Sequence, residues 1–236
     1  MHKSTRVGGS WGNQPPHRRR AGSGRAVGKE SRYGHLQNRL FRRKPGKQFH
    51  QSGPLQGLIS VAPPELEFHE IAIKDLPLYS ADYDADFPPA GRELKDAIAA
   101  SDGILFVSPP EYNRSIPGAL KNAIDWGSRP WGSNSFARKP TGIIGASPGG
   151  IGTAVMQSSM RSVLSFLDAP QLNAPEAYIR FVADAYDDDG SVKDEGTAGL
   201  LRHYMEEYSA FVQRVLAANA PGHIGDQEPD SAKLTR

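Results

Sequence analysis

Three adjacent residues, Glu111, Tyr112 and Asn113, place a carboxylate, an aromatic ring and an amide side by side in the chain. Pro110 precedes them and Pro117 follows, and both prolines restrict the backbone of this segment. A planar heterocyclic ligand needs a stacking surface and hydrogen-bonding groups at its edge, which these residue types supply. An ordinary polar loop built on an asparagine turn accounts for the same residues equally well on composition alone.

A second candidate is the glycine-rich turn that contains Ser147, Gly149 and Gly150. Small residues allow the backbone to approach a ligand closely, and a helix N-terminus after such a turn favours electron-rich groups. A plain strand-to-helix turn has the same composition, so this turn alone is a weak signal. Its value depends on whether it lies at the same edge of a sheet as residues 108–117.

The expected secondary structure brings the two loops together. Residues 104–107 and 141–146 are short apolar runs, typical of strands that are buried on both faces. Periodicity completes the pattern, with strands expected at 66–73 and 177–182 and helices at 91–100, 117–126, 153–167 and 200–218. Alternating strands and helices predict an α/β fold with a parallel sheet, whose ligands bind at the carboxyl ends of the strands. Both loops follow strands, so we expect both at this edge.

The charge of the chain is divided unevenly. Of its 28 Lys and Arg residues, 13 fall in residues 1–57, where Glu30 is the only acidic residue. A basic arm of this kind suits nucleic-acid binding, but it has few aromatic residues and no known binding motif, so we do not expect a nucleic-acid partner. A transit peptide is another interpretation of this Arg-rich, acid-poor stretch.

The sequence contains no cysteine and no apolar run near the roughly 18–20 residues that span a bilayer. Disulfides, thiolate metal sites and a cysteine nucleophile are therefore excluded, and we expect a cytoplasmic protein that does not enter a membrane. The seven histidines show no metal-binding spacing, and residues 187–190 lack the further ligands of a calcium loop. We accordingly expect no metal site.

The two loops belong to a longer series of motifs. In chain order these are Pro110–Asn113, Ser115–Gly118, Leu120–Ala123, Asp125-Trp126, Arg129-Pro130, Lys139-Pro140, Ile143–Gly150 and Phe166–Pro170. Together they resemble the NADPH-dependent FMN reductase family, which includes chromate and quinone reductases. The resemblance covers residues 58–218, and it is specific because the motifs keep their order and spacing.

This resemblance implies a flavodoxin-like, doubly wound parallel sheet that binds FMN without a covalent bond. The residues that correspond to the two flavin loops of the family are Pro110, Glu111, Tyr112, Asn113, Ser147, Gly149 and Gly150. The implied reaction passes a hydride from NADPH or NADH to flavin N5 and then electrons to a quinone, chromate, azo or flavin acceptor. It needs no catalytic acid or base residue. The family also suggests a homodimer or homotetramer.

The sequence departs from the family before residue 58. The family begins with an apolar strand that is central in the sheet, followed by a loop rich in Ser, Arg and Asn that holds the FMN phosphate. Residues 1–57 show neither pattern, so we expect the first strand and the phosphate loop to be missing or replaced. Pro109-Pro110 is a smaller departure, because it adds one residue before the first flavin loop.

We therefore expect three segments in the chain. Residues 1–57 are a basic stretch that is disordered or out of frame, residues 58–218 are the flavodoxin-like reductase domain, and residues 219–236 are a disordered tail. The out-of-frame hypothesis rests on the abrupt change of composition near Leu58. It is wrong if no other reading frame of the gene encodes an apolar strand and a Ser/Arg/Asn loop. The alternative function is a flavodoxin-like protein that is inactive because it lacks the phosphate loop.

Overall fold

A computed structural model of the protein describes residues 36–42, 57–108, 113–187 and 191–220. All of them belong to one unit of the chain, Tyr33–Arg236. Residues 57–60 form a helical turn. The other elements are, in chain order, β1 (Leu36–Arg42), β2 (Leu66–Ala72), η1 (Ala81–Tyr83), α2 (Pro89–Ala99), β3 (Gly103–Ser108), α3 (Gly118–Gly127), β4 (Thr141–Ser147), α4 (Ala154–Phe166), β5 (Tyr178–Arg180), η2 (Ala183–Ala185) and α5 (Glu195–Ala218).

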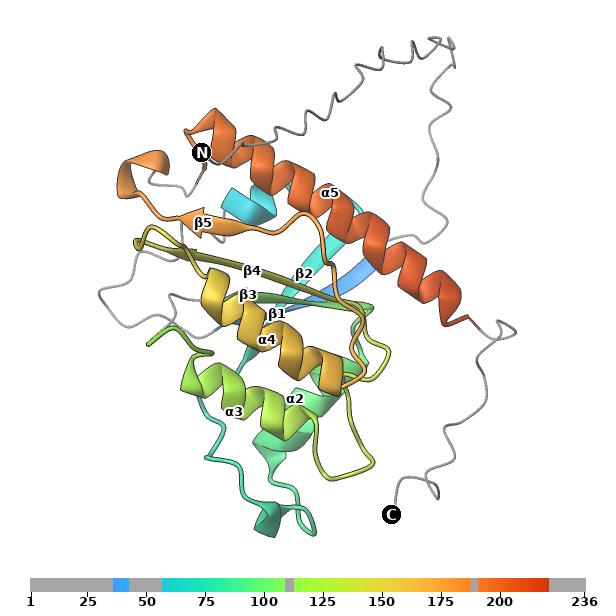
Figure 1. Cartoon of the computed structure of the whole chain (residues 1–236). Coiled ribbons are helices and arrows are strands. Elements are labelled where there is room, and N and C mark those ends of the chain that lie inside the picture. The colour runs from blue at the N-terminus through green and yellow to red at the C-terminus, as the bar shows by residue number, and fades with distance from the viewer. Residues whose placement is uncertain (1–35, 43–56, 109–112, 188–190, 221–236) are drawn as a thin grey trace, which may run out of the picture. The chain divides into compact units, whose positions relative to one another are not determined.

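The five strands form one parallel sheet in the order β2-β1-β3-β4-β5. Figure 1 shows α2, α3 and α4 on one face of this sheet and α5 on the other. The chain thus builds the sheet outward in one direction from β1 to β2 and in the other direction from β3 to β5. This topology confirms the predicted doubly wound, flavodoxin-like α/β fold.

We expected the first strand to be missing or replaced, and the position of β1 excludes only the first of these alternatives. Leu36–Arg42 lies at the centre of the sheet and pairs along its whole length with β2, and residues 38–41 also pair with β3. The sequence pattern hid this strand because only three of its residues are apolar, namely Leu36, Leu40 and Phe41. A β-ladder needs backbone N–H and C=O groups rather than particular side chains, and an empty centre would leave two strand edges unpaired.

The sheet separates two hydrophobic cores. Ile104 and Phe106 of β3 pack in the core that includes α2, α3 and α4, whereas the intervening Leu105 packs in the core that includes α5. All three side chains are fully buried. Adjacent residues Ile143 and Ile144 of β4 are divided between the two cores in the same way. The prediction that these strands are covered on both faces is therefore confirmed.

The last helix begins earlier than its apolar periodicity predicts. That periodicity starts at Leu200, but α5 starts at Glu195, because the Asp194 carboxylate accepts a hydrogen bond from the backbone N–H of Thr197 (2.7 Å). This N-cap satisfies a donor that the first turn of a helix leaves unpaired. The hydrogen bonds from Thr197 hold the pKa of Asp194 below its ordinary value, since they favour the charged carboxylate.

Tyr204 fastens α5 to the sheet. Its side chain is fully buried, and its hydroxyl donates to the backbone carbonyl of Ile143 in β4 (2.9 Å). Burial raises the pKa of Tyr204 well above its ordinary value of 10.0. The folded protein therefore keeps a proton that the unfolded chain loses above this pH. The contribution of Tyr204 to stability is present below the unfolded pKa and is lost as pH rises above it.

We expect Tyr204→Phe to lower the free energy of unfolding at neutral pH by about 1 kcal/mol, because a buried hydrogen bond is removed. The same change should flatten the alkaline fall in stability by up to about 1.4 kcal/mol per pH unit, because one titrating group is removed. Urea unfolding of both proteins at neutral and at alkaline pH measures the two effects. Identical alkaline slopes would contradict the role of this hydroxyl.

Candidate functional site

The candidate site lies at the carboxyl edge of the sheet, where β3, β4 and β5 end at Ser108, Ser147 and Arg180. This edge is at the left of Figure 1. β4 lies between β3 and β5, so the turn after β4 leaves the sheet between the ends of these two strands. The two loops predicted from the sequence therefore leave the same edge of the sheet, as expected.

The turn after β4 presents an open backbone. Ser147 is buried, and its hydroxyl accepts a hydrogen bond from the backbone N–H of Gly149 (3.3 Å). Gly149 and Gly150 are exposed, and a Cβ atom added to Gly150 would meet no atom within 4 Å. A ligand can therefore approach the backbone of this turn closely.

Gly152 closes the turn, and its role was missed in the sequence. Its N–H donates to the carbonyl of Gly149 (3.0 Å), and its φ angle is +57°. A Cβ atom here would lie 3.0 Å from the carbonyl carbon of Tyr178 in β5. Both the left-handed backbone and the close approach require glycine. The spacing of three glycines before a helix was the signal that could have identified it.

Of the four residues of the first predicted flavin loop, Pro110–Asn113, the structure describes only Asn113. Pro110, Glu111 and Tyr112 lie outside the described residues. Asn113 is exposed and has a left-handed backbone, with φ of 53°. The following helix, α3, begins at Gly118 with Pro117 at its N-cap, one position later than the sequence predicts. The assignment of residues 110–113 to the flavin ring therefore stays a prediction.

Asn122 and Trp126 of α3 have a structural role that the sequence did not reveal. The Asn122 side-chain amide accepts from the backbone N–H of Tyr79 and donates to the carbonyl of Pro77, both at 2.9 Å. Trp126 Nε1 donates to the same carbonyl (2.8 Å). These bonds join residues 43 to 49 positions apart, a separation that periodicity does not show. They hold the segment between β2 and α2 against α3.

The remaining sequence candidates give no further site. Within the described ranges, no group of three His, Cys, Asp or Glu side chains is placed to hold a metal ion. Asp187 instead pairs with Lys193 (2.9 Å), and residues 188–190 lie outside the described ranges. No described helix has the length and apolar character needed to cross a membrane.

The sheet topology and the loops at its carboxyl edge define a flavodoxin-like α/β protein. The sequence profile of the NADPH-dependent FMN reductases matches residues 55–184. The chain belongs to the NADPH-dependent FMN reductase family. This confirms the predicted enzyme class, an NAD(P)H-dependent FMN reductase, together with its cofactors, FMN and a nicotinamide nucleotide.

The chain is similar to several characterised proteins. A 2-hydroxy-1,4-benzoquinone reductase from Burkholderia sp is 48% identical over 156 residues, which cover 66% of this chain and 85% of that protein. A quinone reductase from Pseudomonas putida is 42% identical over 159 residues, which cover 67% of this chain and 84% of the relative. Among solved structures, the flavoenzyme NAD(P)H:(acceptor) oxidoreductase FerB from Paracoccus denitrificans is 40% identical with a TM-score of 0.72. The match covers 76% of this chain and 98% of FerB.

Proposed function

We propose that this protein uses NADPH or NADH to reduce quinones through FMN. The observation that carries the proposal is the open turn at Gly149-Gly150, which follows β4 at the carboxyl edge of the sheet, where the neighbouring strand β3 also ends. The similarity to two proteins named as quinone reductases supports the choice of acceptor. Chromate, azo compounds and free flavin are the other acceptors that the family implies.

The described residues fit the ring end of FMN. Bound FMN supplies a ring that accepts a hydride and passes electrons to an acceptor. In our proposal, residues 110–113 and Ser147–Gly150 bind this ring from two neighbouring loops. The exposed glycine backbone admits the edge of a planar ligand. The N-terminus of α4, at Ala154, carries a partial positive charge that favours electron-rich ring atoms near the turn.

The assay measures the transfer of electrons from the nicotinamide nucleotide to the quinone. Under exclusion of oxygen and with one FMN per chain, the purified protein should turn over NADPH or NADH repeatedly only when 1,4-benzoquinone is present, with one nicotinamide nucleotide consumed for each quinone reduced to hydroquinone. Absorbance at the nicotinamide and flavin bands measures both the turnover and the bound flavin. Oxidation of the nucleotide at the same rate with and without quinone would contradict quinone as the acceptor.

We further propose that the protein is a homodimer or homotetramer in the cytoplasm. Leu78 and Trp131 are large apolar residues that are 83% and 77% exposed, which supports contact with another subunit. The absence of cysteine fits a reducing compartment. Light scattering after size exclusion measures the mass of the particle, and the mass of one chain at working concentration would contradict the oligomer.

The phosphate end of FMN leads to a second proposal, about residues 1–57. We propose that this stretch is read out of frame, so that the residues of β1 stand in place of an apolar first strand and the residues after them stand in place of a phosphate-binding loop. The family match begins only at residue 55, close to the change in composition near Leu58. The genetic code offers a stricter test, because some pairs of residues determine what the next reading frame encodes.

A frame that starts one base later joins the last two bases of one codon to the first base of the next. For Lys47-Gln48 and for Gln48-Phe49, the codon formed in this way encodes Asn or Ser with every choice of synonymous codons. The codon shared by His50-Gln51 encodes Ile or Thr. Between His35 and Arg43, every shifted codon permits an apolar residue except one, which encodes Lys or Arg. This apolar run coincides with the residues of β1. The shifted frame therefore permits an apolar strand at β1 and imposes Asn or Ser at each of two positions after it.

The nucleotide sequence of the gene tests this proposal directly. We expect the frame one base later to run without a stop codon through codons 34–57 and to encode mostly Val, Ile, Phe and Ala over β1. A stop codon within this stretch, or a polar strand in every frame, would refute it. In that case the printed residues are the real ones, and the inactive flavodoxin-like protein becomes the favoured function.

A further inference from the structure

Arg114 has a strained backbone in an exposed position. Asn113 and Arg114 have φ angles of 53° and 58°, so two consecutive residues are left-handed. Asparagine tolerates this conformation, but the Cβ atom of arginine makes it unfavourable, and glycine would be relaxed there. Strained backbone conformations cluster at functional sites, so Arg114 is a candidate functional residue.

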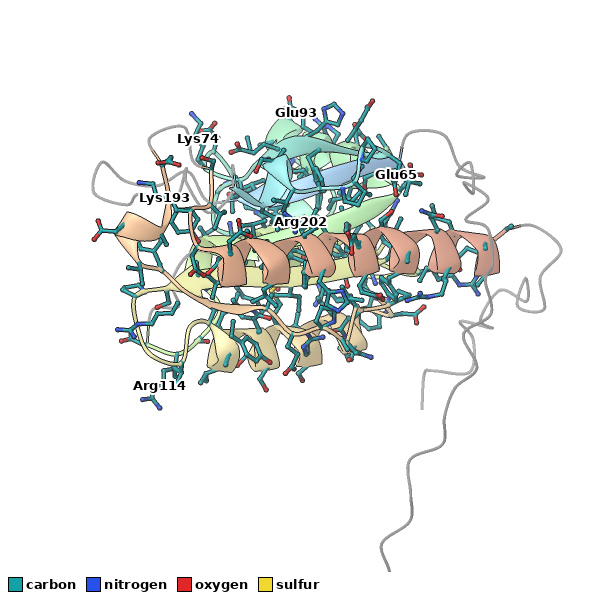
Figure 2. The ribbon with its side chains drawn as sticks, turned by 90° about the horizontal axis from the view of Figure 1, so that it is seen from above. Glu65, Lys74, Glu93, Arg114, Lys193 and Arg202 are labelled. Carbon is teal, nitrogen blue, oxygen red and sulfur yellow. The ribbon has the colours of Figure 1, made fainter. Side chains whose placement is uncertain are left out.

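The Arg114 guanidinium also has no ion-pair partner among the described residues. Figure 2 shows Arg114 pointing away from the body of the protein, at the same end of the molecule as Lys74 and Lys193. Lys74 pairs with Asp75 (3.4 Å) and Lys193 pairs with Asp187. No carboxylate of the described residues lies within ion-pair distance of the Arg114 guanidinium.

Arg180 provides a second cation at this edge. It is the last residue of β5, it is exposed, and no described carboxylate pairs with it. The chain after residue 57 is acidic overall, which repels anions at long range. Two arginines without an ion-pair partner among the described residues therefore belong to segments at the carboxyl edge of the sheet.

We propose that Arg114 binds the 2′-phosphate of NADPH and so makes the enzyme prefer NADPH to NADH. This inference rests on the proposed function, because it concerns the reductant of the same site. The two nucleotides differ only in that phosphate, so a group that distinguishes them must recognise its charge and oxygen atoms. A guanidinium does so with two parallel hydrogen bonds, which a single ammonium group does not form.

Variants of Arg114 test the proposal by direct binding. 2′,5′-ADP carries the distinguishing phosphate and 5′-AMP lacks it, so calorimetry with the two compounds needs neither flavin nor turnover. We expect Arg114→Ala to weaken 2′,5′-ADP binding by about 10-fold or more and to change 5′-AMP binding by less than about twofold. Arg114→Lys should weaken 2′,5′-ADP binding by an intermediate amount. Arg202→Ala, which removes an exposed arginine from α5, should change the binding of neither compound.

Arg114→Gly separates function from structure. It should lose the preference for 2′,5′-ADP as Arg114→Ala does, while its unfolding temperature rises by about 2–4 °C because the left-handed strain is relieved. Equal weakening of 2′,5′-ADP and 5′-AMP, or unchanged binding of both, would overturn the proposal. In turnover, the KM for NADPH should rise in Arg114→Ala while the KM for NADH stays constant. If the original protein oxidises neither nucleotide, the proposed function fails, and the binding result still decides the role of Arg114.

Discussion

We expect a variant chain, in which codons 34–57 are read one base later and the original frame resumes at Leu58, to bind FMN more tightly than the printed chain. The expected gain in affinity is about 100-fold or more. The FMN phosphate carries up to two negative charges and needs hydroxyl and backbone N–H donors. The shifted frame imposes Asn or Ser at two successive positions after β1. Each charge-assisted hydrogen bond contributes about 1.5–3 kcal/mol, so two such bonds account for the expected gain.

Riboflavin is the matched ligand for this experiment, because it has the same ring system without the phosphate. Calorimetric titration of both chains with FMN and with riboflavin separates the two ends of the ligand. We expect the frame change to strengthen FMN binding far more than riboflavin binding. Equal affinities of the two chains for FMN would contradict the frame proposal, and failure of the printed chain to bind FMN would support the inactive alternative for that chain.

Gly152→Ala should lower the free energy of unfolding by about 1–3 kcal/mol. Its φ of +57° is unfavourable for alanine, and the added Cβ would lie 3.0 Å from the backbone of Tyr178. Gly150→Ala is the matched control in the same turn, because its Cβ would meet no atom within 4 Å. We expect this control to change stability by no more than about 0.5 kcal/mol. Urea unfolding of the two variants without flavin measures the difference.

The same pair of variants tests where the flavin lies. The open side of Gly150 is the space in which we place the FMN ring, so a methyl group there should weaken FMN binding by about 10-fold while the fold stays intact. Titration of FMN fluorescence measures this affinity. Unchanged FMN affinity in Gly150→Ala would place the ring elsewhere, and equal losses of stability in the two variants would contradict the geometry of the turn.

The strands of the fold were predictable where burial leaves a clear pattern. Leu105 and Ile144 lie in apolar runs because their strands are covered on both faces, and those runs marked β3 and β4. β1 was missed because the sheet holds it through backbone pairing, which does not depend on an apolar sequence. The first turn of α5 was missed because the Asp194 cap, rather than periodicity, fixes where the helix begins.

The site was predictable to the level of loops but not of contacts. The glycine turn could be assigned to the carboxyl edge because β-strands followed by helices place their loops there. The bonds from Asn122 to Pro77 and Tyr79 could not, since a side chain on a helix and a distant loop share no local signal. The left-handed backbone of Arg114 was equally invisible, because arginine is not a residue that indicates a positive φ.

The central position of β1 affects how newly synthesised chains fold in the cell. Until β1 docks, β2 and β3 each present an unpaired edge, and such edges recruit strands from other chains. The segment that must cover both edges is a seven-residue strand with only three apolar side chains. We therefore expect aggregation during synthesis, rather than unfolding of the finished protein, to limit the yield of the printed chain, and chaperones to raise that yield.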